Sequence, residues 1–466
     1  MVEAYLAKQG YTLPGKEMRK LQDLWLNWYK GFVEKEHTYN LYTGQDIIPC
    51  RRRALGMAKV VCEDFGSLLV NEHVQITADG FDELADILKD NRFGTRMNRL
   101  AELTMALGTG AVVEFLDEEK KPVIDYIRAD KVYPLSWDNE DVSECAFASK
   151  KVVDKEDGKT EEVTYIQIHR KEKGGWKIKN VCLNSAGEEV ALPAGMAEES
   201  PVSPVPLFQI VRPNTVNSAD LDSPLGASVY ADALEQLMDC DIVWDSYINE
   251  FVLGKKRILV PMSLSTIQTH KPGEDGSETL DPIFDTNDTL FYVYESDTAE
   301  KPIELDMNLR TAEHDTGLQR AIDMLSKKCG LGMGRYKVES GNVKTATEVI
   351  SAKSDLYQSL KRHEKTFGDA IIGMVRALAW MMKKSPDLDV SVKFDDSIIE
   401  DENATLDRCV KMVTNGLMSR VEAIMRLENV DEEEAKRRYA LIVQEQAADI
   451  DETEQAMLRL GTGGGL

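Results

Sequence analysis

Large apolar residues recur at alternating steps of four and three near the end of this chain: Phe367, Ile371, Met374, Leu378 and Met381. This spacing places side chains on one face of an α-helix, and we expect that helix to span Thr345 to Lys384. At 1.5 Å per residue, about 40 residues form a rod of about 60 Å, which is roughly twice the width of a small domain. Such a rod is typical of a spine inside a large assembly rather than of an enzyme core.

A glycine-rich loop precedes this helix, over residues 330–344. Its glycines give the backbone access to positive φ angles, so the loop can change conformation. Thr345 and Glu348 then form a Thr-x-x-Glu capping box, which satisfies backbone donors at a helix N-terminus. The pattern predicts a mobile loop that is joined to a well-defined helix start.

Turn residues and apolar periodicity divide the rest of the chain into a helical region, a β-rich region and two helices that flank a small β module. The expected elements are helices over 51–70 and 81–107, strands over 111–115, 123–128, 132–135, 145–153, 163–170 and 176–183, a helix over 224–253, strands within 258–306, a helix over 309–328, and a strand over 390–394 before three C-terminal helices. The fold class is therefore α+β.

Asp241 interrupts the apolar face of the helix expected over 224–253. An acidic residue at that position requires either solvent or a polar partner from another chain. We therefore expect Asp241 to lie at a contact between subunits, with this helix packing laterally on a neighbouring copy.

The net charge of −25 is the unusual feature of the composition. A polyanionic surface repels nucleic acid and anionic lipid unless basic groups are segregated, so sequence-specific duplex binding is disfavoured. Charge is in fact segregated: residues 385–466 hold 19 acidic and 9 basic side chains (9 − 19 = −10), whereas residues 345–384 hold seven basic and four acidic ones (7 − 4 = +3).

Three consecutive arginines, Arg51, Arg52 and Arg53, open the helix expected over 51–70. They can bind a phosphate or the carboxylates of a neighbouring subunit. In a chain this acidic, we favour a salt-bridge patch between subunits over nucleic acid.

Motifs for catalysis, metals and nucleotides are weak. The Gly-Thr-Gly turn at residues 108–110 ends a helix and opens a strand, the reverse of a phosphate-binding loop. Seven scattered cysteines without C-x-x-C spacing indicate reduced core thiols, and no histidine pair has metal-ligand spacing. We expect no cofactor, no metal, no secretion signal and no membrane span.

Five segments, in order along the chain, resemble portal proteins of tailed bacteriophages, and most closely the siphophage type of Gram-positive hosts. They are WYKGFVEKEHTYNLYTG, RRRALGMAKVVCEDFGSLLVNE, LGTGAVVEF with IRADKVYPLSWDN, GNVKTATEVISAKSDLY, and NGLMSRVEAIMRLENVDEEEA. The resemblance covers nearly the entire chain.

The resemblance implies a homo-oligomeric ring, with twelve copies expected, at one capsid vertex of the virion and assembled in the host cytoplasm. Double-stranded DNA would pass through it without sequence specificity. Other implied partners are the terminase large subunit, the head-to-tail adaptor, and capsid and scaffolding proteins. The implied parts are an N-terminal wing (1–223), a first stem helix (224–257), a clip (258–308), a second stem helix (309–329), a tunnel loop (330–344), a long wing helix with a returning strand (345–395), and C-terminal crown helices with a tail (396–466).

Within the implied tunnel loop, Arg335, Lys337 and Lys344 are candidates for transient contacts with the DNA backbone. Pairing of these cations with acidic residues of adjacent subunits is the alternative. Two other functions stay open: a metal-dependent nuclease that uses acidic clusters such as Asp395 and Asp396, and a scaffold protein without a DNA channel.

Overall fold

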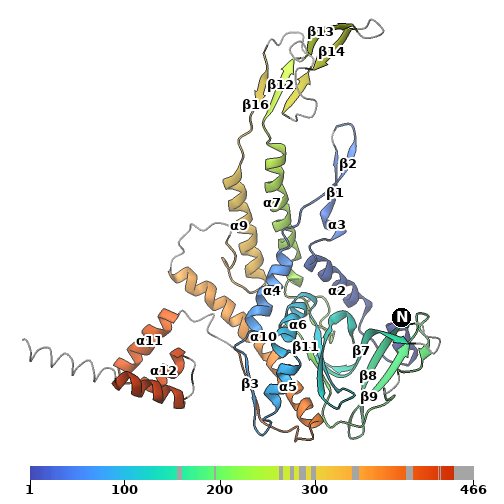
Figure 1. The fold of residues 1–466 in the computed structure, drawn as a ribbon, viewed down its shortest axis with the longest axis vertical. Coiled ribbons are helices and arrows are strands. Elements are labelled where there is room, and N and C mark those ends of the chain that lie inside the picture. The colour runs from blue at the N-terminus through green and yellow to red at the C-terminus, as the bar shows by residue number, and fades with distance from the viewer. Residues whose placement is uncertain are drawn as a thin grey trace, which may run out of the picture. The chain divides into compact units, whose positions relative to one another are not determined.

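The computed structural model divides the chain into two compact units, Met1–Phe394 and Asp395–Leu466, and each is described by itself. Figure 1 labels the elements. No described helix is long and apolar enough to cross a membrane. The structure describes residues 1–42, 44–154, 160–193, 196–261, 266–272, 278–282, 290–294, 301–337, 346–394, 402–428, 430 and 432–444.

The first part of the first unit is mainly helical, as the sequence predicts. Its elements are α1 (Val2–Lys8), α2 (Lys16–Tyr29), α3 (Glu34–His37), β1 (Thr38–Tyr42), β2 (Ile47–Arg51), α4 (Met57–Leu69), β3 (Gln75–Ala78), α5 (Leu84–Asp90) and α6 (Phe93–Leu107). The expectation that Arg51 opens a helix is wrong. Residues 47–51 pair with residues 38–42 as an antiparallel hairpin, and α4 begins only after Gly56, whose φ is 77°.

Two antiparallel sheets follow, and they contain all of the strands expected between residues 111 and 183. The smaller sheet has the order β11-β4-β5 and the larger one β10-β9-β8-β7-β6. Their bounds are β4 (Gly110–Leu116), β5 (Pro122–Arg128), β6 (Val132–Asp138), β7 (Asp141–Asp154), β8 (Thr160–Glu172), β9 (Gly175–Leu183), β10 (Glu189–Val190) and β11 (Phe208–Val211), with the 3-10 turn η1 (Ala129–Lys131) before β6.

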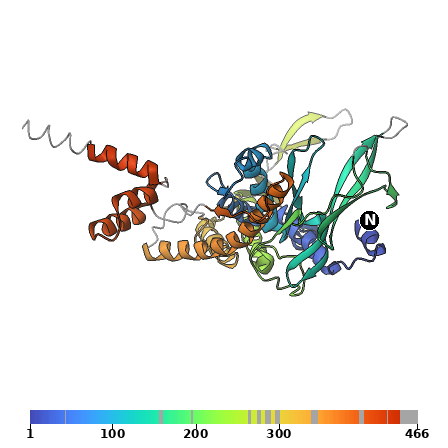
Figure 2. The same ribbon diagram turned by 90° about the horizontal axis from the view of Figure 1, so that it is seen from below.

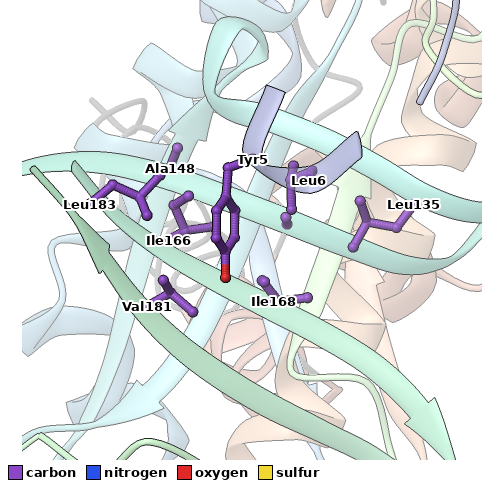
Figure 3. Close-up of a cluster of buried hydrophobic side chains, with 9 residues drawn as sticks. Tyr5, Leu6, Leu135, Ala148, Ile166, Ile168, Val181 and Leu183 are labelled. Atoms are coloured by element: carbon purple, nitrogen blue, oxygen red, sulfur yellow. The ribbon is translucent and has the colours of Figure 1, made fainter. Parts of the chain in front are cut away.

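The larger sheet is covered on one face by α1. Tyr5 and Leu6 lie against buried sheet residues such as Ile166 and Val181 (Figure 3). The Tyr5 hydroxyl donates to Glu189 Oε1 at 2.8 Å, so the aromatic ring is buried while its polar end has a partner. This contact ties the N-terminus to the sheet edge formed by β10.

The long helix is α10 (Ala346–Met381), of 36 residues. All five residues of the stripe are buried, as expected. The stripe is covered within the same chain, because α10 packs on β11, β4 and α4 (Figures 1 and 2), so its burial requires no other copy. Gly373 permits this packing, since an added Cβ would lie 2.2 Å from Gln209 Oε1.

After Pro224 the structure differs from the expected helix. Residues 225–230 are buried without helical structure, and the Tyr230 hydroxyl donates to the Trp25 carbonyl at 2.8 Å. Gly108 and Gly226 meet here, since a Cβ on Gly108 would lie 2.3 Å from the Gly226 carbonyl oxygen. A short 3-10 turn, η2 (Ala231–Ala233), then leads into α7 (Leu234–Leu253).

The helices α7 and α9 (Thr311–Lys328) pack side by side and are joined by a strand-bearing segment (Figure 1). The Glu250 carboxylate on α7 accepts two hydrogen bonds from the Arg310 guanidinium, at 3.0 and 2.8 Å. The joining segment forms the sheet β15-β12-β16 and the hairpin β13-β14. These strands are β12 (Arg257–Pro261), β13 (Thr266–Pro272), β14 (Glu278–Pro282), β15 (Phe291–Tyr294) and β16 (Ile303–Leu305).

The first unit ends with β17 (Val390–Lys393), which pairs with β3. The second unit contains α11 (Glu402–Thr414), α12 (Arg420–Glu428) and a helix over 432–444, as the sequence predicts. Cys409 and Met418 belong to its small apolar core. All seven cysteines of the chain are free, and six of them are buried, in agreement with the prediction of reduced core thiols.

The buried His363 on α10 predicts a pH dependence of stability. The Asn214 amide donates to its Nδ1 at 3.0 Å, the Phe65 ring packs edge-on against it, and burial lowers its pKa to about 4. In the unfolded chain the pKa of a histidine is near 6.5, so as the pH falls the unfolded chain takes up a proton on His363 before the folded chain does. The contribution of neutral His363 to folding stability is therefore fully present above about pH 6.5 and decreases as the pH drops toward 4. The full contribution is about 3 kcal/mol.

We expect His363→Gln to lose less stability than the wild-type chain between pH 7 and pH 4.5, as measured by urea unfolding. His73→Gln is the matched control, because His73 is exposed. Equal losses in wild type and His363→Gln would contradict the assignment.

Candidate functional site

The predicted DNA-contact residue Arg335 is engaged within its own chain. Its guanidinium makes two hydrogen bonds to the Asp64 carboxylate on α4, Nε to Oδ2 at 2.7 Å and Nη2 to Oδ1 at 2.5 Å. The Tyr336 hydroxyl donates to the same carboxylate at 3.1 Å. The hydrogen bonds to Asp64 raise the pKa of Arg335. Such a two-point pair is geometrically specific and leaves little of the guanidinium for a phosphate. Arg335 therefore anchors the segment after α9 within its own chain, and its roles as a DNA contact or as a partner of an adjacent subunit stay predictions.

Further hydrogen bonds join this segment to side chains of α9. The Gly334 amide donates to Asp323 Oδ1 at 2.8 Å, and the Gln319 side-chain amide donates to the Tyr336 carbonyl, also at 2.8 Å. Lys337 is exposed and forms no ion pair with any described residue. Lys344, like Thr345 of the capping box, lies outside the described residues.

Exposed cations lie along α9 and near its C-terminal end, and the sequence analysis had named only Lys337 among them. We define the α9 basic surface as Arg320, Lys327 and Lys328 on α9, Arg362 on α10, and Lys337. All five side chains are exposed, and within the described ranges none makes an ion pair. Arg362 lies at the end of α9, since a Cβ added to Gly330 would be 3.8 Å from its Nη2.

The sequence contains only a weak signal for this surface. Lys327 and Lys328 precede Gly330 at a helix end, where cations commonly stabilise the negative helix pole. Arg362 lies 34 residues beyond Lys328 and reaches α9 only through the tertiary fold. The basic surface can bind phosphate through charge without sequence readout.

The predicted subunit-contact residue Asp241 has its polar partners in the same chain. It is buried on α7, and its Oδ2 lies 2.9 Å from Nε2 of the buried His37. The other ring nitrogen of His37, Nδ1, lies 2.9 Å from the Val33 amide nitrogen and 3.0 Å from the Val33 carbonyl oxygen, so both ring nitrogens have a polar neighbour. The Leu55 amide donates to Asp241 Oδ1 at 2.6 Å. Burial raises the pKa of Asp241, while these hydrogen bonds oppose that shift. The reason for assigning Asp241 to a subunit contact is therefore removed.

The three arginines also make contacts within their own chain. Arg53 donates to Asp245 Oδ1 through both its amide, at 3.1 Å, and its guanidinium, at 3.3 Å. Arg52 donates to the Glu36 carbonyl at 2.7 Å, and the Arg51 guanidinium lies 4.2 Å from the centre of the Phe32 ring. The Arg53 contacts fix the segment between α3 and α4 against α7, and a salt-bridge patch of the three arginines with another subunit stays a prediction.

The other candidate motifs have packing roles or lie outside the described residues. The Gly-Thr-Gly turn joins α6 to β4, and the Gly226 amide donates to Thr109 Oγ1 at 3.0 Å. Asp395 and Asp396 are not among the residues that the structure describes. Within the part of the chain that the structure describes, no group of three or more histidine, cysteine or acidic side chains could hold a metal ion.

Comparison with known proteins assigns the chain to a family. The sequence profile described as "Phage portal protein, SPP1 Gp6-like" matches residues 19–456. The chain belongs to the phage portal protein family. Its role is therefore structural, as a portal protein of a bacteriophage virion, and its mixed helical and strand architecture is the α+β portal fold. The predicted Gram-positive host stays a prediction.

Solved structures similar to this portal protein include two from gene transfer agent (GTA) particles. A chain of "Neck of native GTA particle computed with C12 symmetry" is 12% identical with a TM-score of 0.41, covering 79% of this chain and 89% of that one. A chain of "Virion of native gene transfer agent (GTA) particle" is 13% identical with a TM-score of 0.38, covering 80% of this chain and 89% of that one. No curated protein matches the sequence.

The Arg335–Asp64 pair predicts how the segment after α9 responds to mutation. Asp64→Ala removes the acceptor of Arg335 and Tyr336, and we expect a loss of about 1 kcal/mol in the free energy of unfolding, because the half-buried Tyr336 hydroxyl loses its partner while the exposed Arg335 can turn to water. Trypsin should then cleave faster after Arg335. Lys337→Ala, which removes an exposed side chain, is the control and should leave stability unchanged. Unaltered unfolding and cleavage in Asp64→Ala would show that the pair does not hold the segment.

Proposed function

We propose that this portal protein forms a closed ring, with twelve copies expected, around a channel for double-stranded DNA. The observation that carries the proposal is the exposure of apolar side chains on two opposite sides of α7: Ile242 and Leu253 lie on one side, and Phe251, nine residues after Ile242, lies on the other. Ile242 is 40% exposed, Phe251 41% and Leu253 63%, although they lie on a helix that is packed against α9. Exposed apolar side chains gathered on one element typically mark a contact with another protein. Lateral packing of α7 and α9 between copies would cover them.

The parts of the chain have proposed roles in this ring. Helices α7 and α9 would form the stem, and the strands that join them would form the clip that contacts the terminase large subunit and later the head-to-tail adaptor. The remaining N-terminal residues with α10 would form the wing, which contacts capsid and scaffolding proteins, and residues 396–466 would form the crown and tail. Residues 330–344 would contain the tunnel loop.

Oligomeric state tests the ring directly. Native mass spectrometry of the full chain at micromolar concentration is expected to give one closed oligomer, because an α7 surface with this much exposed apolar area is costly in water. A stable monomer under the same conditions would overturn the proposal.

The charge distribution suits a conduit in which DNA slides. An acidic wall disfavours strong phosphate binding, and a small basic surface supplies only weak contacts. We propose that the α9 basic surface, rather than Arg335, makes these contacts. Lys337 and Lys344 stay candidates for the same role.

Charge reversal tests the DNA contacts. Lys327→Glu with Lys328→Glu should reduce the yield of particles retaining full-length DNA severalfold, because two phosphate-attracting groups become repulsive. Lys16→Glu with Lys89→Glu is the matched control, since both lysines are exposed elsewhere and the change in charge is the same. Rings should form in both variants. Equal DNA content in both would rule out the α9 basic surface as a contact.

A further inference from the structure

Glu114 on β4 is a carboxylic acid buried inside the first unit. It is 0% exposed, and no described residue bonds to either of its carboxylate oxygens. The one group that favours its ionised form is its own amide, which already donates to the Leu207 carbonyl at 3.2 Å. A buried carboxylate without a partner is very costly, so Glu114 is protonated in the folded chain.

The register of β4 places Glu114 beneath two helices. Strand alternation puts Gly110, Val112 and Glu114 on one face of the sheet β11-β4-β5. A Cβ added to Gly110 would lie 2.3 Å from a side chain of α6, so α6 covers this face. Gln209, the β11 partner of Val112, lies against Gly373, so α10 covers the same face. Glu114 therefore lies in the layer between the sheet and these two helices.

The groups around Glu114 supply no charge that would stabilise its ionised form. Tyr126 on β5 is its diagonal neighbour on the same face, because Glu114 pairs with Ile124 and Tyr126 pairs with Val112. The Tyr126 hydroxyl is also buried without a partner among the described residues. The charge of Arg96 on α6 acts on Tyr126, whereas burial is the cause that raises the pKa of Glu114. β11 carries no charged residue, and the other charged side chains of α6, β5 and the part of α10 over the sheet are exposed or bonded elsewhere: Arg99, Glu102, Asp125, Arg128, Asp369 and Arg376.

Of the two helices, α10 is the one that only packing holds in this layer. The helix α6 continues into β4 through the Gly-Thr-Gly turn, and at its start the Asn91 side chain bonds to two backbone groups of β5. Along Phe367–Met381 of α10, no side chain forms a hydrogen bond or an ion pair with another described residue. The nearest such bonds are those of Thr366 and Lys384, beyond the two ends of this stretch. A charge in the layer therefore displaces α10 more easily than α6.

We propose that Glu114 is a pH-sensitive switch in the contact between α10 and the sheet β11-β4-β5. The protonated acid permits close packing, and loss of its proton to solvent creates a charge that is stabilised only when α10 moves and water enters. The switch is complete within one chain and does not depend on the proposed ring. In an assembled portal it would act on the helix that follows the proposed tunnel loop, and this consequence alone rests on the proposed function.

The pH dependence of unfolding provides the first test. In the unfolded chain a glutamate loses its proton near pH 4.3, whereas folded Glu114 keeps its proton to higher pH, so each pH unit between the two values favours unfolding up to tenfold. The ratio of the wild-type unfolding constant to that of Glu114→Gln should rise at least tenfold from pH 5 to pH 6.5 in urea unfolding, because glutamine cannot ionise and the other groups are common to both chains. Glu118→Gln, at an exposed position in the turn after β4, is the matched control and should give a constant ratio. A rise of less than threefold for Glu114→Gln would overturn the proposal.

Hydrogen exchange with mass spectrometry locates the effect without global unfolding. Over the same pH range, protection of peptides from residues 367–381, corrected for the intrinsic exchange rate, should fall at least threefold more in the wild type than in Glu114→Gln. Peptides from β7 and β8 in the larger sheet should fall equally in both chains. Equal falls along α10 in the two chains, or an extra wild-type fall confined to α6, would contradict the switch. Neither test requires assembly, so a chain that forms no ring would contradict the proposed function and leave this inference to be decided by its own result.

Discussion

The carboxylates of Asp241 and Asp245 fix α7 against the segment between α3 and α4. Asp241 is buried and bonds to His37 and to the Leu55 amide, while Asp245 receives the Arg53 amide and guanidinium. A buried carboxylate is costly unless it is paired, so α7 cannot rotate or slide without breaking these bonds. The pairs therefore couple the α7–α9 helices to the body and set the side of α7 from which the β1–β2 hairpin rises.

A second set of contacts fixes the segment that follows α9. Asp64 on α4 holds Arg335 and Tyr336, and α4 in turn packs against α10. Because Arg335 is occupied in this way, the cations near the end of α9 that form no ion pair with a described residue are Lys327, Lys328 and Arg362.

Patterns with strong periodicity predicted the fold well, and residue roles that depend on tertiary contacts were predicted poorly. The α10 stripe follows directly from its spacing, and its five residues are buried. The same spacing does not reveal what covers the stripe, which is the chain's own sheet and α4. Arg51 was wrongly predicted to open a helix. It belongs to β2, a short strand of the β1–β2 hairpin without the long apolar run that would have indicated a strand. The partners of Asp241 and Arg335 could not be predicted from the neighbouring sequence, because His37 lies 204 residues from Asp241 and Asp64 lies 271 residues from Arg335.

The central claim is that copies of this portal protein join in a ring through surfaces whose positions are fixed by pairs within each chain. An electron cryomicroscopy reconstruction of the purified full-length protein at side-chain resolution tests it most directly. The account predicts a ring with an open centre, His37 bonded to Asp241 inside every copy, and α7 and α9 packed laterally between copies. Single particles without a central opening, or a ring in which the exposed apolar side chains of α7 remain in solvent, would contradict it.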